Sequence, residues 1–161
     1  MGLSGGTKKL AVSGAVVALY VSIMAATAGF AFGQYQIRIA TALYAMAGVY
    51  PWLVVPLGVA NMLGNLLLGG LGIFDVVGGL MVGIATSGCV ALIRRVTDRV
   101  YLLVLPVALV PAFAVPVWLS AISELPYLTL VLSLLAGQAI SAFSLGIVLL
   151  KIKWPSDKWF S

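Results

Sequence analysis

The polar side chains of this sequence that could do chemistry are few, and several of them lie together near position 35. Gln34, Tyr35, Gln36 and Arg38 stand between two long apolar stretches. Amides donate and accept hydrogen bonds, a guanidinium only donates, and an aromatic ring can stack on a planar molecule. The chemistry on offer is noncovalent recognition, and we expect this segment to form one wall of a solute-binding pocket.

Other polar residues are predicted to complete the pocket from neighbouring helices. Asn61 and Asn65 are four residues apart and therefore share one helix face. Either they bind a ligand or they hydrogen-bond to another helix and hold the two helices together. For Asn61, which is deeper in the helix, we favour the contact between helices. The predicted substrate-binding residues are Gln34, Tyr35, Gln36, Arg38, Asn65, Asp75, Trp118 and Gln138.

Two of these residues have a plainer interpretation. Asp75 could cap the helix that follows the turn Gly69-Gly70-Leu71-Gly72. Arg38 could be a membrane anchor whose guanidinium reaches the interface. Alternatively, Arg38 pairs with Asp75 and holds the empty site together.

Catalysis and metal binding are not expected. The sequence has no histidine, one cysteine (Cys89) and no P-loop, so it offers no Cys/His metal set and no internal disulfide. No Ser/Lys or paired-carboxylate arrangement stands out. We therefore predict a protein that is not an enzyme and needs no cofactor.

The elements that must position these residues are membrane helices. Of 161 residues, 63% are hydrophobic and 8% are charged, and the mean hydropathy is +1.18. Residues 10–37, 39–74 and 125–150 carry no charge, and each run exceeds the ~20 residues that cross a bilayer. The sequence predicts an all-α, polytopic membrane protein, whose net charge of +5 reflects loop topology and not a nucleic-acid partner.

The number of crossings follows from three basic clusters, at Lys8 and Lys9, at Arg94, Arg95 and Arg99, and at Lys151, Lys153 and Lys158. If all three are cytoplasmic, even numbers of crossings separate them. The block 39–71 is too long for one helix and divides at Tyr50-Pro51-Trp52. We predict one domain over 1–161 with both termini cytoplasmic and six helices, the second short, at about 10–32, 37–49, 52–69, 73–95, 101–121 and 125–150.

The N-terminal segment allows a second interpretation. Lys8 and Lys9, the apolar run and Ala26-Thr27-Ala28 imitate a cleavable signal peptide. We disfavour cleavage because it would break the parity of the crossings. On the same segment Ala11 and Ala15, followed by Ala18 and Ser22, form a stripe of small residues. Such a stripe lets another helix approach closely, in a partner or within the bundle.

Three stretches together carry a resemblance to a known family. They are residues 10–21 (LAVSGAVVALYV), 36–43 (QIRIATAL), and 60–65 (ANMLGN) with 72–78 (GIFDVVG). In this order they resemble the QueT family of queuosine-precursor transporters, which are substrate-binding S components of energy-coupling factor (ECF) importers. The Gln-x-Arg segment and the Asn...Gly-x-x-Asp block are the more specific parts.

The resemblance implies a six-helix protein of the plasma membrane that captures a 7-deazapurine from outside. It would then dock on a transmembrane coupling subunit driven by two ATPase subunits, and Ala11 and Ala15 would match the docking motif. A carboxylate such as Asp75 could accept two adjacent N–H groups of a deazaguanine, while Gln36 or Asn65 reads the carbonyl. Tyr35 or Trp118 could stack on its ring.

One departure from the family concerns the cargo. Thr41 stands where the family favours a carboxylate, so we favour a less cationic precursor, with a nitrile and not an aminomethyl group. An S component for another vitamin-like solute remains an alternative. A different alternative is a membrane scaffold without a small ligand, which predicts a packed and dry outer half.

Overall fold

The structure is a computed structural model, which describes residues 4–31, 37–69 and 71–155. Helices are the only regular secondary structure in these ranges, and the predicted all-α membrane fold is confirmed. The helices are α1 (Gly5–Ala26), α2 (Ala28–Ala31), η1 (Ile39–Gly48), η2 (Pro51–Leu53), α3 (Val54–Gly64), η3 (Asn65–Gly69), α4 (Ile73–Arg94), α5 (Val100–Ala114), α6 (Pro116–Ser123), α7 (Tyr127–Ser141), η4 (Ala142–Gly146) and α8 (Ile147–Lys151).

Within the described residues, five helical segments are long and apolar enough to cross a membrane. They are Gly5–Ala26, Pro51–Gly69, Ile73–Arg94, Val100–Ser123 and Tyr127–Lys151. The remaining apolar helix, η1, has only ten residues. The expectation of a short second helix is therefore confirmed.

The η1 segment is a 3₁₀-helix in the middle of the bundle, and not an α-helix facing lipid. Nine of its ten residues are buried, and it contacts α1, α3, α4, α5 and α7. At ~2.0 Å per residue a 3₁₀-helix of this length spans about 20 Å, which is less than the hydrocarbon thickness. Its four alanines, Ala40, Ala42, Ala45 and Ala47, are all buried and let the surrounding helices come close. The chain then turns at Val49 and Tyr50, and Pro51 begins η2.

The helices α3 and α4 pack through glycine. A Cβ atom added to Gly83 would lie 2.7 Å from the Cα atom of Gly58, which is closer than nonbonded carbon atoms approach each other. A Cβ atom on Gly58 would lie 2.5 Å from Cγ1 of Ile84. This close contact fixes the relative position of the two helices that carry Asn61 and Asp75, and Asn65 begins η3 directly after α3.

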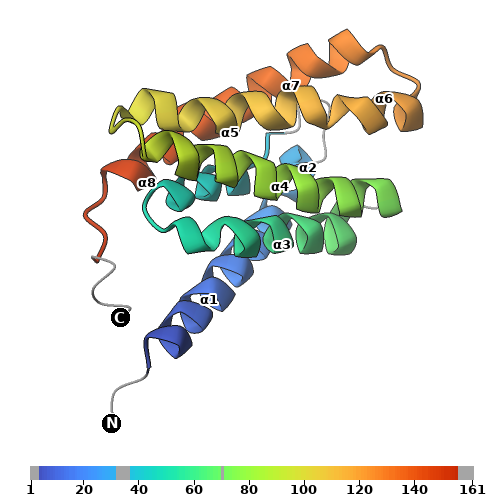
Figure 1. The fold of residues 1–161 in the computed structure, drawn as a ribbon. Coiled ribbons are helices and arrows are strands. Elements are labelled where there is room, and N and C mark those ends of the chain that lie inside the picture. The colour runs from blue at the N-terminus through green and yellow to red at the C-terminus, as the bar shows by residue number, and fades with distance from the viewer. Residues whose placement is uncertain (1–3, 32–36, 70, 156–161) are drawn as a thin grey trace.

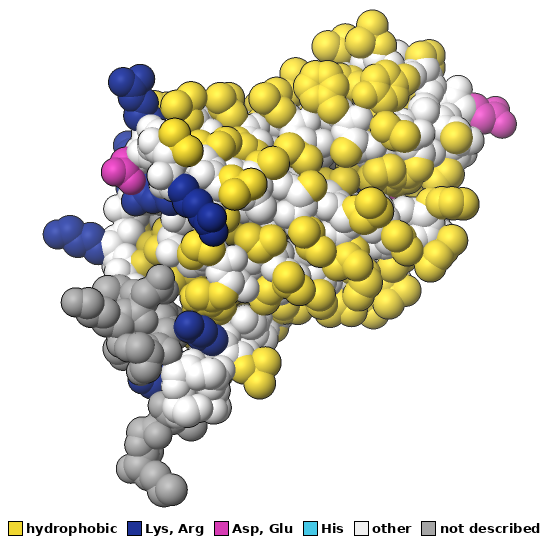
Figure 2. All heavy atoms as spheres, viewed as in Figure 1, with side chains coloured by type: hydrophobic (Ala, Val, Ile, Leu, Met, Phe, Trp, Pro, Cys, Tyr) yellow, Lys and Arg dark blue, Asp and Glu magenta, His cyan; other side chains and the backbone are white. Residues whose placement is uncertain are grey.

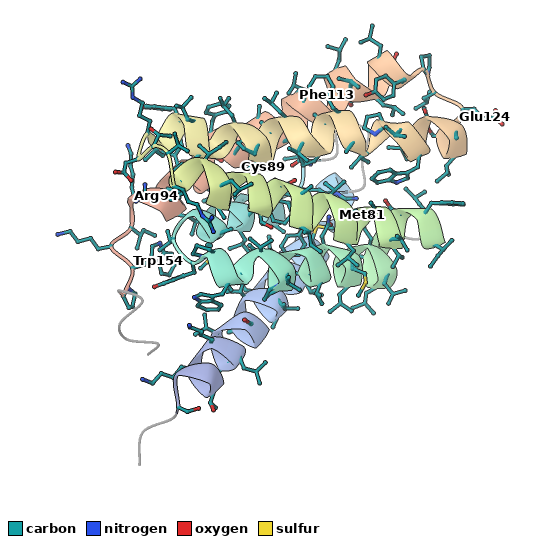
Figure 3. The ribbon with its side chains drawn as sticks, viewed as in Figure 1. Met81, Cys89, Arg94, Phe113, Glu124 and Trp154 are labelled. Atoms are coloured by element: carbon teal, nitrogen blue, oxygen red, sulfur yellow. The ribbon has the colours of Figure 1, made fainter. Side chains whose placement is uncertain are left out.

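Charge is concentrated at one end of the bundle. Figure 2 shows Lys and Arg side chains gathered there, and in Figure 1 the start of α1, the end of α8 and the connection between α4 and α5 lie at that end. Glu124, with a left-handed φ of 58°, ends α6 and marks the opposite end (Figure 3). The described members of the three basic clusters thus share one end, as an even number of crossings between the clusters requires, while Lys158 lies outside the described residues.

The first helix presents its small residues outward. Ala11, Ala15, Ala18 and Ser22 are exposed, whereas Val16, Tyr20 and Met24 are buried against the bundle. In Figure 1, α1 runs obliquely to the nearly parallel α3, α4 and α5. Its outward face is therefore open to lipid or to another helix.

Candidate functional site

Arg38 is the centre of a buried polar cluster. Its side chain is 4% exposed, and Nη1 donates to Oδ1 of Asn65 at 3.0 Å and to Oδ1 of Asn61 at 3.3 Å. Its Nε donates to the carbonyl of Ala31 at 3.4 Å. A guanidinium in hydrocarbon needs such acceptors. The interpretation of Arg38 as an interfacial anchor is therefore wrong.

Each of the two asparagines uses both ends of its side-chain amide. The oxygen accepts from Arg38, and the nitrogen donates to the backbone of α4. Nδ2 of Asn61 donates to the carbonyl of Gly79, and Nδ2 of Asn65 donates to the carbonyl of Asp75, both at 2.8 Å. Each amide thus ties α3 or η3 to α4 while its oxygen holds Arg38. A Cβ atom on Gly79 would come within 2.6 Å of Nδ2 of Asn65, so the site needs glycine there.

Two tyrosines extend the cluster in a direction that the sequence did not indicate. The hydroxyl of Tyr20 donates to Oδ1 of Asn61 at 3.2 Å and lies 3.2 Å from the hydroxyl of Tyr44. Both rings are fully buried. The only sequence signal was the position of Tyr20 in the middle of an apolar helix, where a hydroxyl in hydrocarbon requires a partner.

Thr41 links the cluster to α7. Its Oγ1 lies 2.7 Å from Oε1 of Gln138 and 2.6 Å from the carbonyl oxygen of Arg38. A hydroxyl has one proton, so it donates to one of these oxygens at a time. This contact joins η1 to α7, 97 residues further along the chain.

The polar cluster encloses very little free space. A cavity of about 10 Å³ is lined by Arg38, Thr41, Tyr44, Asn61, Val82, Pro111, Val115 and Gln138. That volume is about what one water molecule requires. The cluster is closed in this structure.

Asp75 adjoins the cluster at the start of α4. It is 2% exposed, and its Oδ1 accepts a hydrogen bond of 3.4 Å from Nε1 of Trp118. Among the described residues no group bonds its Oδ2. A Cβ atom on Gly78 would lie 2.6 Å from the Trp118 ring, so this glycine makes room for the indole.

Two hypotheses about Asp75 are corrected. The N-cap residue of α4 is Gly72, and no side chain caps this end of the helix. Asp75 is therefore not the cap. Its position in the first turn nevertheless suits the positive end of the helix dipole. Within the described ranges, Arg38 and Asp75 form no ion pair; the ion pair found there joins Arg94 to Asp98. Asn65 stands between them and bonds the Arg38 side chain and the Asp75 backbone.

The predicted site residues thus fall into three groups. Arg38, Asn65 and Gln138 meet in the cluster, and Asp75 and Trp118 adjoin it through Asn65. Gln34, Tyr35 and Gln36 lie outside the described residues. Tyr20 and Tyr44 join the cluster without having been predicted, and Thr41, which the sequence singled out only for the charge of the cargo, joins it through Gln138.

The described residues form an α-helical membrane protein whose polar side chains gather in one internal cluster. Polar groups inside a membrane bundle are typical of membrane transport proteins, where they mark solute pathways. The particular family is shown by the family model of the QueT transporter, which matches residues 10–153. The chain belongs to the QueT transporter family. Comparisons with curated proteins and with solved structures gave no match.

Proposed function

We propose that this protein is the solute-binding S component of an ECF-type importer and that its cargo is a 7-deazaguanine precursor of queuosine. The observation that carries the proposal is a buried carboxylate, Asp75, whose Oδ2 has no partner among the described residues. An unpaired carboxylate oxygen in a membrane bundle is costly, and a ligand with two N–H donors would satisfy it. Membership of the QueT transporter family supports the same conclusion.

A hollow beside Asn65 supplies the room that the closed cluster lacks. It has a volume of about 320 Å³ and is lined by Asn65, Leu66, Gly72, Ile73 and Val76. This volume lies within the ~300–1,000 Å³ usual for small-molecule pockets. In our proposal the base enters here, Asp75 accepts its N–H groups, Asn65 reads its carbonyl and Trp118 stacks on its ring. Arg38 and Gln138, which line the small cavity of the adjoining cluster, and Gln34, Tyr35 and Gln36 are proposed as further binding residues.

The charge of the cargo is proposed from Thr41 and Arg38. Both line the small cavity, so the site holds a fixed positive charge and a neutral hydroxyl in place of a second carboxylate. An aminomethyl group would bring a further cation into a medium of low dielectric constant, where like charges repel strongly. The proposal therefore favours the neutral, nitrile-bearing precursor.

The proposed orientation places the basic end and both termini in the cytoplasm, as the positive-inside rule requires. The exposed stripe of Ala11 and Ala15 near this end would dock on a transmembrane coupling subunit that carries two ATPase subunits. The site would then open outward at the plasma membrane, and ATP hydrolysis would belong to the partners.

Uptake tests this function together with its docking surface. Cells that make the chain with a coupling subunit and two ATPase subunits should accumulate a labelled 7-deazaguanine. Ala15→Trp should abolish accumulation and copurification with the coupling subunit but leave ligand binding intact. Ala121→Trp, the same change on an exposed position of α6, should alter neither. Accumulation of a vitamin and not of a deazaguanine would keep the S-component role and overturn the cargo.

A further inference from the structure

A second feature, remote from the polar cluster, is a large groove between α4 and α5. Its volume is about 760 Å³, and it is lined by Cys89, Leu92, Ile93, Val96, Thr97, Leu102, Leu105, Pro106, Leu109 and Val110. The lining residues on α4 and on α5 are three and four apart, so one face of each helix forms one wall, and Val96 and Thr97 extend the groove into the connection after α4. Leu92 and Val96 are 59% and 88% exposed. The groove is apolar and open to the lipid phase.

The groove ends at the basic end of the bundle. Figure 3 shows Cys89 midway along α4 and Arg94 at its end. Arg94 is paired with Asp98 at 3.0 Å. Arg95 and Arg99 flank the connection between the helices and are exposed, and among the described residues no side chain forms an ion pair with either guanidinium.

We propose that this groove binds an anionic glycerophospholipid, with an acyl chain along α4 and α5 and its phosphate between Arg95 and Arg99. The apolar walls match an acyl chain, and charge complementarity selects the headgroup, because basic pockets between membrane helices attract anionic lipids. Guanidinium groups bind phosphate oxygens in a bidentate manner. The hydroxyl of Thr97, at the same end of the groove, adds a hydrogen-bonding group for the headgroup.

The binding site is tested by thermal unfolding of the purified full-length chain in detergent. Dioleoylphosphatidylglycerol should raise Tm in a saturable manner, and dioleoylphosphatidylcholine should raise it much less. The double variant Arg95→Gln/Arg99→Gln should lose the difference between the two lipids. Lys151→Gln/Lys153→Gln removes the same charge at the same end but away from the groove, and should keep the difference.

A second variant tests the groove itself. Leu105→Trp would fill part of the groove without changing any charge, and should abolish stabilisation by phosphatidylglycerol even if its own Tm differs from that of the parent. Glycerol phosphate, which has the headgroup charge without chains, should not stabilise the parent protein. Equal stabilisation by both lipids, a lipid preference retained in Arg95→Gln/Arg99→Gln, or no response to phosphatidylglycerol would each overturn the proposal.

Discussion

At the level of single residues, the main device of this molecule is the use of amides to hold a buried cation. Arg38 is bonded by the oxygens of Asn61 and Asn65, and the nitrogens of the same amides hold the backbone of α4. An asparagine can do both because it has an acceptor and two donors. The residues that organise the site are therefore also those that hold α3 to α4.

Removal of the Arg38 side chain should destabilise the protein. Arg38→Ala would leave the Asn65 oxygen without its donor and would deprive Asn61 of one of two. Buried hydrogen bonds to a charged group are worth ~1.5–3 kcal/mol each, so we expect a loss of about 3 kcal/mol, measured as a lower Tm in detergent. Lys153→Ala, at an exposed position, should change Tm little. An unchanged Tm in Arg38→Ala would contradict the structural role.

Asp75→Asn should separate function from stability. The amide oxygen can still accept from Trp118, while the charge that a ligand would use is lost. We expect ligand binding to weaken at least about tenfold while Tm stays the same or rises, because an unpaired buried charge is removed. Glu124→Gln, at an exposed turn, is the control. Normal binding by Asp75→Asn would remove Asp75 from the site.

Part of this cluster could be predicted and part could not. Arg38, Asn65 and Gln138 were predicted because polar side chains are rare in so apolar a chain. Tyr20 and Tyr44 were missed because α1 and η1 are apolar on every face, so that no hydrophobic periodicity shows which face turns inward. Asn61 was correctly interpreted as a tie, since its deeper position pointed to a neighbouring helix.

At the level of elements, the unusual feature is a 3₁₀-helix of ten residues at the centre of a membrane bundle. The break at Pro51 could be predicted from one proline and the limit on helix length. The 3₁₀ geometry could not, because the alanine-rich sequence of η1 suits an α-helix equally well. The tighter 3₁₀ form occurs where η1 packs against α1, α3, α4, α5 and α7. No local sequence pattern encodes this packing.

The contact between α3 and α4 gives a matched pair of glycine substitutions. Gly83→Ala would place a methyl group 2.7 Å from the Cα atom of Gly58 and should cost about 1–3 kcal/mol through overpacking. Gly88→Ala, on the same helix, meets its nearest atom, Cγ1 of Val54, at 3.9 Å. It should be neutral or stabilising by up to ~1 kcal/mol, through helix propensity. Equal Tm values for the two variants would refute the close contact.

At the level of the whole molecule, the polar cluster and the basic clusters occupy separate regions. The described residues of the basic clusters gather at one end (Figures 1 and 2), whereas Asp75 and Trp118 lie away from it, where α4 begins and α6 follows α5. This separation is what an importer needs if cargo enters on one side and partner subunits act on the other. It could be predicted by counting charges and crossings, although the count alone does not show how the helices pack.

The orientation of this arrangement can be measured by cysteine labelling. In a Cys89→Ala background, Glu124→Cys should react with an impermeant maleimide added to intact cells. Ser4→Cys and Lys153→Cys should react only after the membrane is opened. Labelling of Ser4→Cys in intact cells would reverse the proposed orientation.

Calorimetric titration of the purified protein would show whether the site around Asp75 and Asn65 binds a deazaguanine. The nitrile-bearing 7-deazaguanine should bind more tightly than the aminomethyl form and far more tightly than guanine, and its binding should be lost in Asp75→Asn. If no deazaguanine binds to a protein that is folded by its Tm, the account of the site is contradicted.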